Sequence, residues 1–126
     1  MTSFPILVVD DDPTILATVA DALDFEGYPV LTATNGEEAL AVLAAAGGRP
    51  RLVLLDMRMP VLDGWGFMRA VREREISLSV VVMTAASDAR RWAREIGAQD
   101  VLAKPFELDE LLAAVQRCGG QLCGET

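Results

Sequence analysis

The stretch ILVVDDDP, residues 6–13, places four apolar residues directly before three aspartates and a proline. A short run of β-branched and leucine residues is apolar on both faces, which is typical of a strand buried in a parallel sheet. Asp12 and Pro13 then favour a helix start, because aspartate is a preferred N-cap and proline is tolerated at the first helical position. The stretch predicts a buried strand that leads directly into a helix.

Four further apolar runs of this kind follow, at residues 30–33, 52–55, 80–83 and 101–103. Each run is followed by a stretch with apolar residues at helical spacing, and glycines at 27, 47–48 and 97 end three of these helices. Five strand–helix units joined by right-handed crossovers predict an α/β fold. We expect a doubly wound, three-layer (βα)5 sandwich with helices on both faces of a parallel sheet.

The length and composition fit one small domain. The chain has 126 residues, and the pattern predicts a core over residues 5–118 with a C-terminal tail over residues 119–126. The net charge of −8 argues against direct binding to nucleic acid or to an anionic membrane. No membrane span or signal peptide is expected, and two cysteines form no disulfide framework, so a cytoplasmic location is predicted.

The sequence contains no histidine. Serine–histidine and cysteine–histidine catalysis on this chain are therefore excluded, together with zinc sites that use histidine ligands. Phosphohistidine cannot form on this chain either.

Chemically useful residues follow four of the five apolar runs. Asp10 and Asp11 follow the first run, Asp56 the third and Thr84 the fourth, while Lys104, the only lysine, follows the fifth. Ligands of open parallel sheets bind outside the carboxyl ends of the strands. Clustered carboxylates attract a hard cation such as Mg²⁺, and an ammonium and a hydroxyl can bind a phosphoryl group. The set predicts phosphoryl transfer in which one carboxylate attacks.

Each of these residues also has a purely structural interpretation. Asp12 is favoured as a helix cap over a metal ligand. Thr84 and Asp63 are common turn residues, and an isolated Lys104 is usually solvated. The conjunction favours the functional interpretation, because unrelated turn residues would rarely place the required group at four strand ends.

Several segments together resemble the motif set of response-regulator receiver domains. They are ILVVDDDP (6–13), LVLLDMRMP (52–60), DG (63–64), VMTA (82–85) and KPF (104–106). The resemblance runs from residue 6 to about residue 117. It implies a flavodoxin-like fold with strand order 2-1-3-4-5. It also implies a signalling phosphoacceptor domain of a two-component system or phosphorelay, which assists its own phosphorylation and dephosphorylation, rather than an enzyme.

The resemblance also assigns roles at the metal site. Asp56 corresponds to the phosphoacceptor, and Asp10 and Asp11 correspond to the acidic pair that holds Mg²⁺. The backbone carbonyl of Arg58 corresponds to a further metal ligand.

The resemblance implies that Thr84 and Lys104 contact the phosphoryl group. It also implies that the peptide bond between Lys104 and Pro105 is cis. The implied phosphodonor is a histidine kinase, a histidine phosphotransfer protein or a small acyl phosphate. A homodimer through the fourth helix, fifth strand and fifth helix is a further expectation from the family.

The sequence departs from the family at the switch residue. Val101 stands where the family usually has the aromatic that rotates inward, so we expect an atypical output. Trp92 is a substitute candidate, although a tryptophan on an amphipathic stripe usually belongs to the core. The Arg58 side chain is expected to lean over the pocket, pair with carboxylates or phosphate and modulate phosphoryl lifetime. Ala85 and Ala86 are small and leave the pocket mouth open.

Two competing functions remain. Asp10-x-Asp12-x-Thr14 resembles the first motif of haloacid-dehalogenase-like phosphatases, with Asp10 as nucleophile, but only Asp109-Glu110 in a predicted helix follows Lys104 as a further acidic pair. The other alternative is a pseudo-receiver that binds partners independently of phosphorylation. The sequence does not identify the cognate kinase, the output partner or the oligomeric state.

Overall fold

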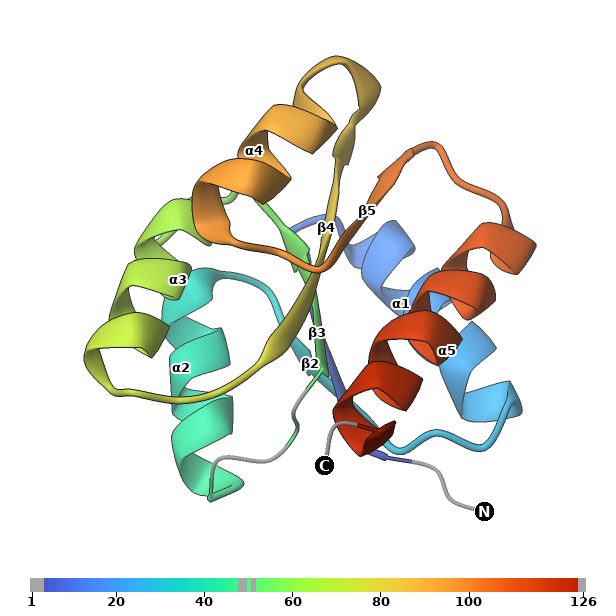
Figure 1. Cartoon of the computed structure of the whole chain (residues 1–126), viewed down its shortest axis with the longest axis horizontal. Helices are drawn as coiled ribbons and strands as arrows, with labels where there is room; N and C mark the ends of the chain where they lie inside the picture. The colour runs from blue at the N-terminus through green and yellow to red at the C-terminus, as the bar shows by residue number, and fades with distance from the viewer. Residues whose placement is uncertain (1–3, 48–49, 51, 125–126) are drawn as a thin grey trace.

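The fold is a five-stranded parallel sheet between two layers of helices (Figure 1). The computed structural model describes residues 4–47, 50 and 52–124, with only the backbone described for residues 86 and 119–124. The strand order is β2-β1-β3-β4-β5, which confirms the predicted topology. The strands are β1 (Ile6–Val9), β2 (Val30–Ala33), β3 (Leu52–Asp56), β4 (Ser79–Ala85) and β5 (Asp100–Lys104).

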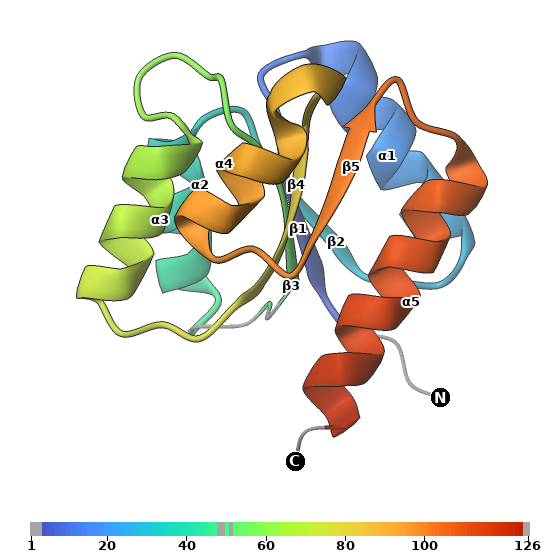
Figure 2. The same cartoon turned by 45° about the horizontal axis from the view of Figure 1, so that its top comes forward.

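The helices divide between the two faces of the sheet. Helices α1 and α5 cover one face, and α2, α3 and α4 cover the other (Figures 1 and 2). Their bounds are α1 (Pro13–Phe25), α2 (Gly36–Ala45), α3 (Gly64–Glu73), η1 (Ala86–Asp88, a short 3-10 helix), α4 (Ala89–Ile96) and α5 (Leu108–Gly124). None of the helices in the described part of the chain is both long and apolar enough to cross a membrane.

Alternation along each strand explains the two cores. In β1, Ile6 and Val8 belong to the cluster beneath α1 and α5, whereas Leu7 and Val9 belong to the cluster beneath α2, α3 and α4. Successive side chains of a strand point to opposite faces, so a strand that is covered on both faces must be apolar throughout. All four β1 residues are fully buried, as the sequence predicts.

Short polar side chains set where the helices begin. Asp12 accepts hydrogen bonds from the backbone N–H groups of Thr14 and Ile15, so its predicted capping role is confirmed. Asp63 caps α3 in the same way through the N–H of Gly66. These caps fix the points at which the chain leaves the sheet edge that carries the candidate site.

The burial of one strand and several element boundaries differ from the sequence predictions. The edge strand β2 is partly exposed, because it has a neighbour on one side only. Strand β4 starts at Ser79 and ends at Ala85, since ladder hydrogen bonds extend beyond the apolar run. Helix α5 continues to Gly124, beyond residue 118, where the predicted core ends and the predicted tail begins. Glycines weaken a helix interior but do not forbid it.

Candidate functional site

Three carboxylates meet at the carboxyl edge of the sheet. Asp10 directly follows β1, and Asp56 is the last residue of β3. One oxygen from each of Asp10, Asp11 and Asp56 lies within 4.8 Å of the others. Asp10 is fully buried, Asp56 is 5% exposed and Asp11 is open to solvent. Asp11 is thus the solvent-exposed member of the cluster.

Lys104 is the last residue of the edge strand β5, and its side chain reaches this cluster. Its Nζ lies 2.8 Å from Oδ2 of Asp10 and 3.7 Å from Oδ1 of Asp56. The other Asp10 oxygen, Oδ1, accepts a hydrogen bond from the N–H of Asp12 at 2.9 Å. Both oxygens of Asp10 therefore have partners, whereas the single cation neighbouring Asp56 lies farther away. The peptide bond between Lys104 and Pro105 is cis, which confirms the expectation.

The Asp56 carboxyl is electrostatically destabilised as an anion. Burial raises its pKa from the ordinary value of 3.8 to about 7, and the negative charge of Asp10 acts in the same direction. Lys104 and a hydrogen bond from the backbone of Arg58 lower the pKa but do not offset burial. A divalent cation would relieve this excess of negative charge, and an all-oxygen set of carboxylates suits Mg²⁺.

Thr84 lies on β4, the strand next to β3, and Val101 lies on β5, the edge strand beyond β4. Met83 pairs with Asp56 across β3 and β4, so the buried Thr84 follows at the same sheet edge as the carboxylates. Val101 pairs with Val82 and packs, half-buried, against the core beneath α4. No ring occupies the place of the family's aromatic residue.

The Arg58 side chain takes a different course from the one expected. Its guanidinium carbon lies 5.0 Å from the ring centroid of Trp92, and it forms no ion pair with a carboxylate within the described residues. The guanidinium is thus not paired with a carboxylate of the described part of the chain, because the ring face of Trp92 on α4 offers a competing cation site; its pairing with phosphate and its effect on phosphoryl lifetime stay predictions. Trp92 is 5% exposed, which confirms its predicted place in the core. The Ala86 side chain lies outside the described residues.

Two tryptophans form a cluster that the sequence did not predict. The rings of Trp65 on α3 and Trp92 on α4 meet edge to face with centroids 5.0 Å apart. Nε1 of Trp65 donates a hydrogen bond of 2.9 Å to Oε1 of Glu95. Apolar spacing identifies the buried faces of single helices but not which two rings meet, so the pattern carried no signal for this contact.

The loop between β3 and α3 contains a strained turn. Val61 has φ = +70°, and the N–H of Leu62 donates to the carbonyl of Pro60 at 2.8 Å, so these three residues form a γ-turn. A β-branched residue at positive φ is a genuine outlier, and the Val61 side chain is 72% exposed. The carbonyl of Leu62 accepts from the N–H of Gly36, which ties the loop to α2.

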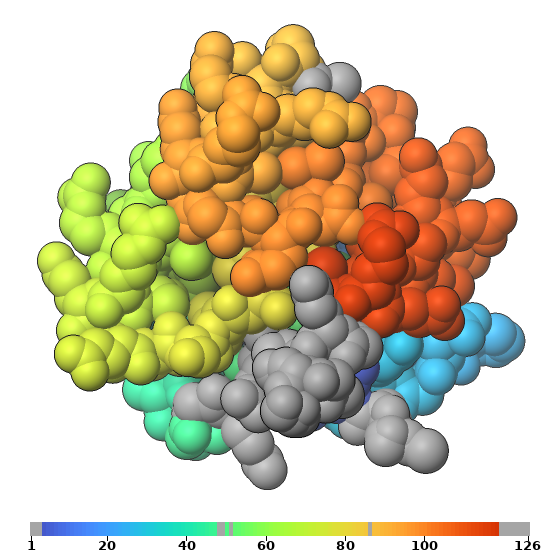
Figure 3. Space-filling view, in the orientation of Figure 1, coloured from blue at the N-terminus to red at the C-terminus, as the bar shows by residue number. Residues whose placement is uncertain are grey.

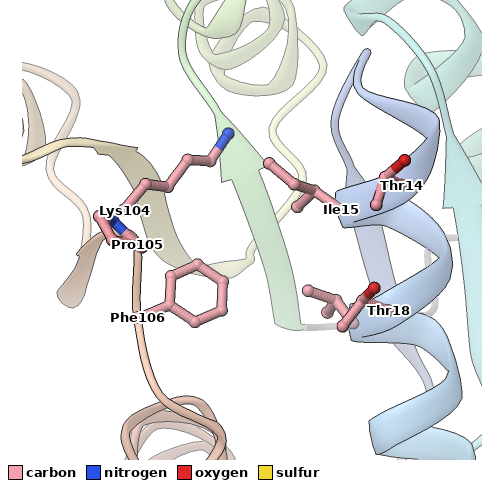
Figure 4. A pocket seen from close by; sticks show the side chains of 7 residues that line it. Thr14, Ile15, Thr18, Lys104, Pro105 and Phe106 are labelled. Atoms are coloured by element: carbon pink, nitrogen blue, oxygen red, sulfur yellow. The ribbon is translucent and has the colours of Figure 1, made fainter.

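A cavity of about 440 Å³ lies beside Lys104, between α1 and the segment after β5 (Figure 4). It is lined by Thr14, Ile15, Thr18, Val19, Lys104, Pro105 and Phe106. The wall is mostly apolar, and the Lys104 side chain extends along it toward the end of β3 (Figure 4). The acidic cluster thus adjoins a surface that offers apolar contacts.

Known proteins share this fold and sequence pattern. The family model of the response regulator receiver domain matches residues 6–116. The transcriptional regulatory protein PrrA of Mycobacterium tuberculosis is 43% identical over 118 residues, which are 92% of this chain and 50% of PrrA. The chain therefore spans about half the length of this relative.

Solved structures agree with this match. A response regulator from Chloroflexus aurantiacus has a TM-score of 0.84 at 33% identity, covering 93% of this chain and 98% of the other. The chemotaxis protein CheY4 of Vibrio cholerae has a TM-score of 0.83 at 32% identity, covering 93% and 99%. The family match, the relatives and the fold show that this chain belongs to the receiver domains of two-component response regulators.

Proposed function

We propose that Asp56 is the phosphoacceptor of this receiver domain. A carboxylate oxygen of Asp56 forms a bond to phosphorus while the bond between phosphorus and the donor atom breaks. These 126 residues contain no histidine, so a phosphohistidine donor must lie outside them, on a histidine kinase or a histidine phosphotransfer protein. A small acyl phosphate is the alternative donor. The observation that carries this proposal is that Asp56 lies beside Asp10 and Asp11 with the Nζ of Lys104 3.7 Å from its carboxylate.

The geometry favours Asp56 over Asp10 as the nucleophile. Asp10 is fully buried, and its two oxygens are held by Lys104 and by the backbone of Asp12. An attack by Asp10 would require both contacts to break. This arrangement argues against the alternative of a haloacid-dehalogenase-like phosphatase, in which Asp10 would be the nucleophile.

Asp10, Asp11 and Asp56 are the residues that would hold Mg²⁺, with the backbone carbonyl of Arg58 as a further ligand. The carboxylate oxygens within 4.8 Å of one another and the raised pKa of Asp56 support this assignment. When bound, Mg²⁺ neutralises charge on the phosphoryl oxygens. The surrounding residues then act on the group directly: Lys104 supplies an ammonium, and Thr84 supplies a hydroxyl that donates a hydrogen bond.

The output follows from a change at the surface around α4, β5 and α5. Val101 cannot report phosphorylation by burying a ring, so we propose that the readout is atypical. This surface is also the one through which a homodimer would form. We place the protein in the cytoplasm and expect no direct contact between this domain and nucleic acid, since its net charge is −8.

The test is phosphate uptake from acetyl phosphate with Mg²⁺, followed by intact-mass measurement. The wild-type chain should gain one phosphoryl group, and Asp56→Asn should gain none. Asp63→Asn is the matched control, because it makes the same chemical change in a nearby helix cap. Uptake by Asp56→Asn would refute the assignment, and failure of the wild-type chain to be labelled would favour the pseudo-receiver. Turnover of small phosphomonoesters would restore the phosphatase alternative.

A further inference from the structure

Arg58 links the candidate site to helix α4. It follows Asp56 by two residues, and its guanidinium carbon lies 5.0 Å from the ring centroid of Trp92. The residue is exposed, so the core does not impose this contact. A group added to the Asp56 carboxylate would lie near Arg58, and a displacement of Arg58 would change the surroundings of Trp92.

Trp92 is well placed to pass such a change on. Its ring packs edge to face on the ring of Trp65. Trp65 in turn donates a hydrogen bond to Glu95, which lies on the next turn of α4. These contacts hold α3 and α4 together, and the two helices present adjoining surfaces on the face seen in Figure 3. The position and exposure of the Trp92 ring thus depend on groups from both helices and on the cation above it.

The Arg58 side chain has open space beside it. A cavity of about 340 Å³ is lined by Met57, Arg58, Met59, Pro60, Asp63 and Trp65. The guanidinium can therefore change its position without displacing core residues. Its present partner, the ring of Trp92, binds the exposed guanidinium more weakly than phosphoryl oxygens would through charge-assisted hydrogen bonds.

We propose that Arg58 is an exchangeable link that moves from Trp92 to the phosphoryl group when Asp56 is modified, and that the loss of its cation changes the packing of Trp92 on α4. The inference rests on the proposed function of Asp56. In this chain Val101 replaces the family's rotating aromatic. The inference therefore assigns the coupling between the Asp56 site and α4 to Arg58 and Trp92. A ligand shifts such an equilibrium only through its different affinity for the two states, and here that difference is the new contact with the anion.

The experiment uses the fluorescence of Trp92 alone. The chain has two tryptophans, so Trp65→Phe leaves Trp92 as the single indole and retains an aromatic edge beside it. Mg²⁺ and beryllofluoride are added as the phosphoryl stand-in, and ¹⁹F NMR reports their binding independently. Trp92 emission should change on binding and reach the spectrum that Trp65→Phe/Arg58→Met shows without ligand. In that double variant, binding should leave the emission unchanged.

Two further variants sharpen the result. Arg58→Lys keeps a cation and should keep a change in emission. Arg90→Met removes an exposed arginine from the same helix and should leave the response of Trp92 intact. An equal response in the Arg58→Met background, or no response while ¹⁹F NMR shows binding, would overturn the inference. A lost response in Arg90→Met would overturn it too, because the effect would then be one of general charge. Absence of bound fluoride in Trp65→Phe would instead refute the proposed function, and the inference with it.

Discussion

Replacing Asp56 by asparagine should stabilise the metal-free protein at neutral and alkaline pH. Folding raises the pKa of Asp56 from 3.8 to about 7, mainly through burial. The folded state therefore holds more protons than the unfolded state between these two values. Since stability falls with pH wherever the folded state binds more protons, the wild-type protein should lose stability as the pH rises from about 4 to about 7.

The size of this loss follows from the same two values. The difference between about 7 and 3.8, at about 1.4 kcal/mol per pKa unit, gives about 4 kcal/mol. The attraction of Lys104, whose Nζ lies 3.7 Å from Asp56, is already included in this difference, because Lys104 lowers the pKa that burial raises. We therefore expect Asp56→Asn to be about 4 kcal/mol more stable than wild type at pH 8.

The assay is urea unfolding in EDTA from pH 4 to pH 8.5. The wild-type curve should fall across this window and the Asp56→Asn curve should be flatter, while Asp63→Asn should follow wild type because asparagine also caps a helix. Mg²⁺ at ten times its dissociation constant should restore about 1.4 kcal/mol to the wild-type protein and little to Asp56→Asn. An Asp56→Asn variant that is less stable than wild type at pH 8 would refute the reasoning.

Three other substitutions test separate features by urea unfolding. Val61→Gly should stabilise the protein by about 1 kcal/mol, because it relieves the positive φ of the γ-turn at the cost of a more flexible unfolded chain; a loss of stability would contradict the strain. Without metal, Lys104→Met should cost about 3 kcal/mol by leaving buried Asp10 unpaired, and adding Asp10→Asn should recover part of it. Independent, additive effects of the two substitutions would argue against the pair. Gly36→Ala should cost about 2 kcal/mol, since the new Cβ would lie 2.6 Å from the Leu62 carbonyl oxygen; an unchanged midpoint would show that the loop yields freely.

Much of the fold was predictable because a parallel sheet covered on both faces requires continuous apolar strands. The runs at residues 6–9 and 30–33 coincide with β1 and β2. The exposure of β2 was not predictable in the same way, because Leu31 reads as a core residue until its position at the sheet edge is known. The extension of α5 past residue 118 was missed, since a pair of glycines predicts an end that tertiary packing can override.

The acidic part of the site was predictable for a topological reason. Strands β1 and β3 are neighbours in a sheet of this order, so their carboxyl ends lie side by side. Asp10 and Asp56 stand at these two ends, and their side chains can therefore meet at the edge of the sheet. The contact between Arg58 and Trp92 was not predictable, because the direction of a long exposed side chain depends on which ring the packing of α4 presents to it. The γ-turn at Val61 was not predictable either, because a valine gives no sequence signal for a positive φ.

The ion pair between Asp10 and Lys104 has a consequence for the growing chain on the ribosome. Its two partners are 94 positions apart, so nearly the whole domain must emerge before the pair can close. A shorter nascent chain would contain Asp10 and Asp56 without the cation that holds Asp10. Since domains fold as units during synthesis, the acidic cluster acquires its ammonium only when β5 docks. Completion of the last strand is thus a condition for pairing Asp10, and an incomplete polypeptide would hold the carboxylates without their ammonium partner.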